Sequence, residues 1–232
     1  MKALRLLRKV LFWLLIFFFG SSVLAVLAYR ILPVGLTPLM VIRCVEQVRT
    51  GEQARFHHEW KPMEKISPQL AIAVVASEDQ NFLKHHGFDM KAIEQAAHEA
   101  EAGGRRRGGS TISQQTAKNV FLWPSSTWLR KGLEAYFTVL IEALWSKQRI
   151  LEVYLNSIEM GDGIYGAEAV AQANFGVPAS RLTESQSALI AATLPNPRKF
   201  DSAHPSRYMQ QRQRKIIREM QNVRVWMRGF WE

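Results

Sequence analysis

Cysteine is almost absent from this sequence of 232 residues, because Cys44 is the only one. The domain must therefore be stable without an internal disulfide. The glycine content is low, at 14 residues, and we find no sequence repeat. Hydrophobic residues make up 47% of the chain. These values exclude collagen-like, disordered and disulfide-framework proteins. The length suits one ordinary globular domain with an accessory segment.

An excess of positive charge is also missing from most of the chain. The formal net charge of +10 alone would suggest nucleic acid or an anionic membrane as a partner. The first nine residues contribute +4 and residues 205–232 contribute +5, which leaves +1 for residues 10–204. We therefore predict no nucleic-acid partner. The charge at the two ends of the chain could instead serve at a membrane surface.

One long uncharged run occurs, at residues 10–29. Twenty residues of helix cover about 30 Å, the thickness of a hydrocarbon core. A cleaved signal peptide is the alternative, but its apolar region usually has only about 7–15 residues. Trp13 and Tyr29 also suit the two membrane interfaces. We predict a membrane anchor, with residues 1–9 as a cytoplasmic basic tail and the chain after Arg30 outside the cytoplasm.

Helical patterns dominate the rest of the chain, and strand signals are weak, so we predict a mainly α fold. Residues 30–66 are interpreted as a juxtamembrane segment with one short helix, and residues 67–205 as the catalytic core. Residues 206–232 form a basic amphipathic helix, either packed on the core or touching the membrane surface. Predicted core helices cover 69–80, 89–102, 110–121, 125–145, 147–159, 163–175 and 183–194, with capping boxes at Thr111/Gln114 and Thr183/Gln186.

Two adjacent carboxylates, Glu78 and Asp79, follow a run of apolar or small residues from Leu70 to Ser77. Burial disfavours the charged form of a carboxylate, and this is one way in which a Glu becomes a base near neutral pH. A solvated helix end is the alternative interpretation. From this segment alone, both interpretations stay open.

A loop of glycine and arginine, residues 103–109, comes directly before Ser110 and Thr111. Backbone N–H groups, a helix N-terminus and guanidinium groups together suit a phosphate. The loop lacks the G-K-[ST] of a nucleotide-binding P-loop, and it could also be merely solvated. Further along the same helix, Gln114 pairs in spacing with Lys118, and Gln115 with Asn119, so polar side chains follow two adjacent rows.

Metal-ligand spacing is missing from the histidines. The pairs His57-His58 and His85-His86 are each adjacent in sequence, no H-E-x-x-H occurs, and one cysteine cannot form a thiolate cluster. We therefore predict no structural or catalytic zinc site.

Arg130, Lys131 and Glu134 lie near the start of a long predicted helix. An exposed ion pair of this spacing would contribute only about 0.2–0.5 kcal/mol. Together with Glu78 and the glycine-arginine loop, however, these residues give two carboxylates, several cations and a phosphate-type loop beside a membrane. Glycosyl transfer from a lipid-linked diphosphate requires such a set.

Five ordered motifs resemble the peptidoglycan glycosyltransferase family, most closely its monofunctional membrane-anchored members. The resemblance runs from about Ser67 to Pro205. It implies a lysozyme-like α fold with a larger head and a small membrane-apposed jaw. The motifs are E-D-x-x-F-x-x-H-x-G from Glu78, GGSTISQQTAKN from Gly108, R-K-x-x-E from Arg130, ILEVYLN from Ile150 followed by GDGIYGAEAVAQANFG, and ALIAATLPNP from Ala188.

The resemblance also implies a function: polymerisation of lipid II into β-1,4-linked glycan strands, with release of undecaprenyl diphosphate, at the bacterial inner membrane. The expected partners are lipid II, the growing glycan chain, membrane lipid and cell-wall synthesis or division proteins. No cofactor is required, although a divalent cation such as Mg²⁺ or Mn²⁺ often helps family members. Transpeptidation is not expected, since no S-x-x-K or K-T-G occurs.

Residue roles follow from the same resemblance. Glu78 would be the base that takes the proton of the acceptor's 4-hydroxyl, and Glu134 would lie near the donor sugar-phosphate. Asn156 and Glu152 would support the fold. The diphosphate would be held by Arg107, Lys118, Arg130 and Lys131, and the substrate subsites shaped by Ser110, Thr111, Gln114, Gln115 and Asn119. We also expect the four cations to converge on one wall of the cleft, with the N–H groups at the helix start near Ser110 pointing to the same place.

Two other function classes remain. A lysozyme-like peptidoglycan hydrolase would also carry an acidic residue at a helix end and a sugar cleft, but it needs neither a phosphate-binding loop nor a lipid anchor. A non-catalytic, membrane-tethered cell-wall module would use the same anchor and surface without any need for Glu78.

Overall fold

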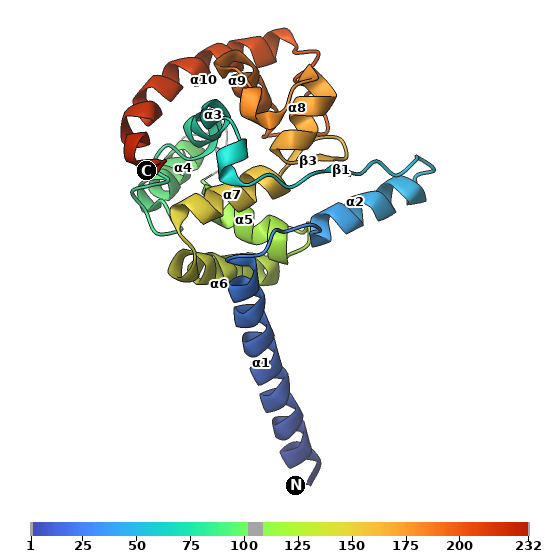
Figure 1. The fold of residues 1–232 in the computed structure, drawn as a ribbon. Coiled ribbons are helices and arrows are strands. Elements are labelled where there is room, and N and C mark those ends of the chain that lie inside the picture. The colour runs from blue at the N-terminus through green and yellow to red at the C-terminus, as the bar shows by residue number, and fades with distance from the viewer. Residues whose placement is uncertain (1, 102–108, 232) are drawn as a thin grey trace.

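The computed structural model describes residues 2–101 and 109–231. Helices account for most of this part of the chain (Figure 1), which confirms the predicted mainly α fold. The helices are α1 (Lys2–Tyr29), α2 (Pro38–Arg49), α3 (Pro68–Glu78), α4 (Met90–Glu101), α5 (Ile112–Phe121), α6 (Trp128–Leu144), α7 (Lys147–Ser157), α8 (Ala167–Phe175), α9 (Glu184–Thr193) and α10 (Arg207–Trp226). Single 3-10 turns occur at Met63–Lys65, Ala179–Arg181 and Arg228–Phe230.

Local sequence signals explain several of the helix starts. Ser67 caps α3 and is followed by a proline at the first helical position, where the missing N–H costs nothing. Both predicted capping boxes are present, Thr111 with Gln114 on α5 and Thr183 with Gln186 on α9. These caps fix the direction in which α5 and α9 leave the preceding loops.

A small three-stranded sheet corrects the prediction for the middle of the chain. Its strands are β1 (His57–His58), β2 (Glu159–Gly161) and β3 (Ile164–Tyr165), in the order β1-β3-β2. The helix predicted over 147–159 therefore ends at Ser157, and the one predicted over 163–175 begins at Ala167. A turn at Gly166 separates the sheet from α8. The turn requires a glycine, because φ is +83° and a Cβ there would lie 2.5 Å from the carbonyl oxygen of Asn156.

Helix α3 is the central helix of the body, by which we mean the part of the protein from α3 to α10. Its residues Leu70 to Ala76 are at most 4% exposed, so it is apolar on every side, as a helix enclosed by others must be. It packs against α9 and α10, and α5 packs against α6 and α7. Because α3 is enclosed from Leu70 to Ala76, Ser77 and Glu78 are the first polar side chains after this stretch that are partly exposed.

Helix α1 has the length and apolar composition to cross a membrane. Its last turns are not free, since Ser22 Oγ lies 2.7 Å from the hydroxyl of Tyr136 on α6. The indole N–H of Trp145 donates to the carbonyl of Val26 at 2.8 Å, and Arg149 donates to the carbonyl of Tyr29. Helix α6 therefore lies across the end of α1, at the foot of the body (Figure 1).

Helix α10 packs on the body at the end farthest from α1 (Figure 1). Met209, Ile216, Met220 and Val223 are buried along one face of α10. This arrangement supports the interpretation of a packed terminal helix over contact with the membrane surface.

Candidate active site

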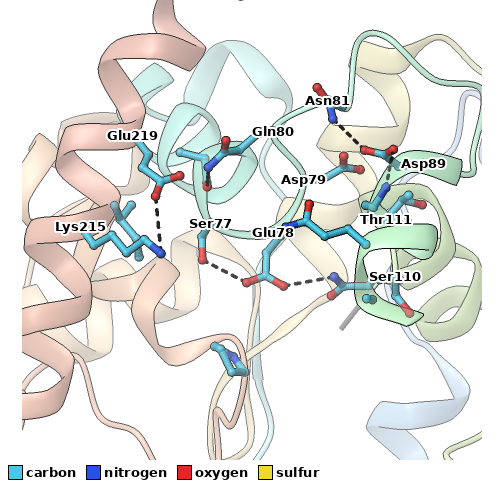
Figure 2. Close-up of a pocket in the computed structure, with 18 of the residues that line it drawn as sticks. Ser77, Glu78, Asp79, Gln80, Asn81, Asp89, Ser110, Thr111, Lys215 and Glu219 are labelled. Carbon is cyan, nitrogen blue, oxygen red and sulfur yellow. Dashed lines mark hydrogen bonds and ion pairs between the residues drawn. The ribbon is translucent and has the colours of Figure 1, made fainter. Parts of the chain in front are cut away.

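An open polar cleft of about 700 Å³ lies between the end of α3, α4, the start of α5 and α10 (Figure 2). Glu78 lines it from the end of α3, and Ser110 lines it from the loop before α5. The opposite wall is α10, through Tyr208, Arg212 and Lys215. The cleft therefore joins elements that are far apart in sequence.

Glu78 is partly buried, and both of its carboxylate oxygens are held by neutral donors (Figure 2). Ser77 Oγ donates to Oε1 at 3.1 Å, and Gln115 Nε2 donates to Oε2 at 3.2 Å. The guanidinium of Arg212 lies 3.8 Å from Oε1 and donates to Ser77 Oγ at 3.0 Å. The solvated helix end considered for this segment is therefore excluded, because Glu78 is oriented by side chains from three helices.

Asp79 has a structural role, unlike the adjacent Glu78. It is buried, accepts from His85 Nε2 at 3.0 Å, and accepts from the backbone N–H of Ile112 at 2.9 Å. His85 Nδ1 accepts from the N–H of Gly87, so the neutral ring carries its proton on Nε2. Asp79 thus joins the end of α3 to the start of α5, and this brings Gln115 to Glu78.

The expectation that the N–H groups at the start of α5 face a diphosphate is wrong for Thr111, Ile112 and Gln114. The N–H of Ile112 donates to Asp79, and the N–H groups of Thr111 and Gln114 are used in the capping box. Gln114 is 5% exposed and acts as a cap, whereas Ser110 and Gln115 line the cleft. Thr111 also lines the cleft, and its hydroxyl donates to the carbonyl of Gly87.

Lys118 is largely buried on α5, and burial lowers the pKa of its ammonium group, although the charges of Glu134 and Glu78 oppose that shift. Arg130 and Lys131 are close enough to add to the lowering. Within the described part of the chain, the ammonium has no recorded hydrogen bond or ion pair. Lys118 is therefore within electrostatic reach of both glutamates and of Arg130 and Lys131. None of these three cations is among the residues that line the cleft, so their convergence on one of its walls stays a prediction.

Glu134 is 3% exposed and is held in contact ion pairs. Arg130 NH1 lies 2.5 Å from Oε2, and Lys131 Nζ lies 2.5 Å from Oε1. Arg130 also donates from Nε to the carbonyl of Ser125. The exposed pair that the spacing alone would allow is therefore not what forms, because the carboxylate is buried and binds both cations.

Of the predicted substrate residues that the structure describes, Ser110, Thr111 and Gln115 line the cleft and the others do not. Arg107 lies outside the described residues, like most of its loop. Asn119 is 3% exposed, and its side-chain Nδ2 is buried with no partner among the described residues. Asn119 therefore does not line the cleft.

Sequence reasoning missed two residues around Glu78. Arg212 comes from α10, far along the chain, and no local motif marks it. Tyr154 is fully buried on α7, and its hydroxyl donates to Gln115 Oε1 at 3.1 Å. Tyr154 belongs to the motif ILEVYLN, but the motif alone assigned it no role.

Across residues 2–101 and 109–231, no group of three His, Cys, Asp or Glu side chains could hold a metal ion. The donor set for a dedicated site is therefore not found in this part of the chain. We assign no step below to a metal ion.

Comparison with known proteins bears on this arrangement of carboxylates and cations. The model of the transglycosylase family matches residues 45–221, which is well over half of the chain. The chain belongs to this family. The match includes Glu78, Lys118, Glu134 and the part of α10 that carries Arg212.

Individual transglycosylases are similar over most of their length. The chain is 60% identical over 210 residues to the biosynthetic peptidoglycan transglycosylase of Bacteroides thetaiotaomicron, covering 90% of this chain and 85% of that one. It is 53% identical to the enzyme of the same name from Caulobacter vibrioides, over 91% and 90% of the two chains. With the Xanthomonas campestris relative, the identity is 50% over 93% and 89%.

Proposed function

We propose that the protein is a peptidoglycan glycosyltransferase, which polymerises lipid II into β-1,4-linked glycan strands and releases undecaprenyl diphosphate. The observation that carries the proposal is the position of Glu78. It lines an open polar cleft and is within electrostatic reach of Lys118, a cation with no contact partner among the residues that the structure describes. The similarity to enzymes named biosynthetic peptidoglycan transglycosylase supports the choice of substrate.

In the proposed reaction, Glu78 accepts the proton of the acceptor's 4-hydroxyl while that oxygen attacks the donor's anomeric carbon. The bond from that carbon to the diphosphate oxygen breaks, and the configuration inverts. Ser77 and Gln115 each hold one carboxylate oxygen, so the base is oriented before the hydroxyl arrives. A positioned general base of this kind contributes about 10²–10⁴-fold to the rate.

The leaving group explains why a second free carboxyl group is not required. In glycoside hydrolysis the departing alkoxide must be protonated, commonly by a second carboxylic acid. A diphosphate leaves as a stable anion, so positive charge can replace the acid. Lys118 has no contact partner among the described residues, and Lys131 is 45% exposed, so of Lys118, Arg130 and Lys131 these two are the more available to the diphosphate.

A membrane location supports the same substrate. In this proposal α1 spans the inner membrane once, with the basic residues before Val10 in the cytoplasm and the catalytic body outside. The foot of the body, α6, then lies at the outer interface, where the lipid chain of lipid II is anchored. Exposed Trp128 and Leu129 at the start of α6 suit that interface.

The test is incubation of the detergent-solubilised full chain with labelled lipid II, with products separated before and after muramidase treatment. A transferase consumes the lipid and yields long products that muramidase degrades. A hydrolase would instead release reducing ends from glycan without consuming lipid II. A non-catalytic module would give no product, and its cellular role would tolerate Glu78→Gln.

A further inference from the structure

Tyr154 is a buried phenol that the proposed reaction does not use. It is 0% exposed, and its hydroxyl donates to Gln115 Oε1 at 3.1 Å. Burial, with smaller contributions from the charges of Glu78 and Asp79, raises the pKa of this phenol well above 10. The hydroxyl therefore keeps its proton at every pH at which the protein works, and it remains a hydrogen-bond donor.

The amide of Gln115 has two different ends, and the structure uses both. Its oxygen accepts from Tyr154, and its nitrogen donates to Glu78 Oε2 at 3.2 Å. A carboxylate can only accept, so an amide turned by 180° would place oxygen against oxygen. A donor on the far side of Gln115 is therefore what keeps the amide nitrogen facing Glu78.

We propose that Tyr154 is a positioning residue that acts through Gln115, whose amide it fixes so that a donor always faces the carboxylate of Glu78. This inference rests on the proposed function. It links a residue in the interior, on α7, to the base at the cleft through one side chain on α5. Tyr154 itself does not line the cleft and does not touch the substrate.

Among the described neighbours of Glu78, Gln115 is the side chain that donates a hydrogen bond to Oε2. The other carboxylate oxygen, Oε1, accepts from Ser77. The guanidinium of Arg212 on α10 donates to the hydroxyl of Ser77 and lies 3.8 Å from the same Oε1. Lys118 on α5 is within electrostatic reach, but it makes no recorded contact with the carboxylate. Without the amide nitrogen, Oε2 would lose its donor and the carboxylate could rotate away from the attacking hydroxyl.

The chain offers a matched control. Tyr165 on β3 is also 0% exposed, and its hydroxyl has no partner in the described part of the chain. Tyr154→Phe and Tyr165→Phe therefore remove the same atom from equally buried rings, but only the first breaks a hydrogen bond. Any general effect of losing a buried phenol appears in both variants.

The experiment measures kcat and KM for lipid II with the full-length protein and four variants: Tyr154→Phe, Gln115→Met, the double variant and Tyr165→Phe. One hydrogen bond between neutral groups is worth about 1 kcal/mol, so Tyr154→Phe should lower kcat roughly fivefold with little change in KM. Gln115→Met should lower kcat at least as much. In the double variant, Tyr154→Phe should add nothing further, because its effect passes through Gln115.

Wild-type kcat in either single variant would overturn the inference, and so would a further loss of roughly fivefold when Tyr154→Phe is added to Gln115→Met. An equal loss in Tyr165→Phe would do the same. If Tyr154→Phe does not fold, wild-type kcat in Gln115→Met would still overturn the inference. This variant should fold, because the side chain of Gln115 lines the cleft and is only partly buried. Failure of the wild-type protein itself to polymerise lipid II would instead contradict the proposed function.

Discussion

The end of α3 and the first turns of α6 each present one glutamate, and the two are held in opposite ways. Glu78 accepts from two neutral donors, and its ion pair with Arg212 is long, at 3.8 Å. Glu134 is enclosed and contacts two cations at 2.5 Å. The first lines the open cleft and has only neutral hydrogen-bond donors in close contact, so it can take a proton from a substrate, whereas the second is enclosed and paired with two cations. The same side chain thus serves as a base in one region and as a holder of cations in the other.

Glu78→Gln breaks the comparison at its most sensitive point. The amide keeps the shape and can still accept one hydrogen bond, but it cannot take a proton, so turnover of lipid II should fall by about 10²–10⁴-fold. The unfolding temperature should stay close to wild type. Glu184→Gln, on the outside of α9, is the matched control and should keep full turnover. Near-wild-type polymerisation by Glu78→Gln would remove this residue from the mechanism.

Lys118→Ala tests whether this cation, which is within electrostatic reach of both glutamates, stabilises the leaving group. Removing one preorganised electrostatic contact costs about 10²–10³-fold in kcat, and we expect a loss of that size. Lys118→Arg should recover part of it, because the charge survives while the geometry changes. Single-turnover rates with labelled lipid II give the comparison directly. Equal rates for Ala and Arg at this position would show that charge is not what matters.

Glu134→Gln should have a smaller effect on turnover, roughly tenfold, since one neutral amide can still accept from one of its two partners. Its larger effect should be on folding, because Arg130 is mostly buried and would lose its counter-charge. A thermal melt should therefore separate the two glutamates, with Glu134→Gln unfolding at a lower temperature than Glu78→Gln. The reverse order of melting temperatures would contradict the roles assigned to them.

The alkaline limb of the pH–rate profile gives the smallest and most specific effect. Burial lowers the pKa of Lys118 below 10.5, so its charge is lost as pH rises through that lowered value. Activity that depends on this charge should therefore decline at a pH where an ordinary lysine is still protonated. In Lys118→Arg the decline should move to higher pH, and kcat/KM is the quantity to follow because it reports the free enzyme. An unchanged limb would assign the decline to another group.

Local signals in the sequence predicted the helices well. The caps at Thr111 and Thr183 and the enclosed apolar run before Glu78 each act within one or two turns, so they can be recognised without a structure. The strands could not be predicted in the same way. β1 and β3 have two residues each and pair across about a hundred positions, so neither has a pattern of its own.

The site was predictable where its residues sit in compact motifs, as Glu78 and Lys118 do. It was not predictable where the partner comes from another helix. Arg212 reaches Glu78 because α10 packs along α3, and Asp79 accepts both from His85 and from the N–H of Ile112 at the start of α5. Such contacts depend on packing between distant elements, which spacing within a motif does not encode.

The contacts of α1 with Tyr136, Trp145 and Arg149 mean that anchor and catalytic body tilt as one piece. A spanning helix responds to a change in hydrocarbon thickness by tilting. In the proposed membrane arrangement, such a tilt would also turn the cleft relative to the plane in which lipid II diffuses. Acyl chain length in a vesicle thus becomes a control on turnover that acts at a distance, through the angle of the whole molecule and not through any residue of the site.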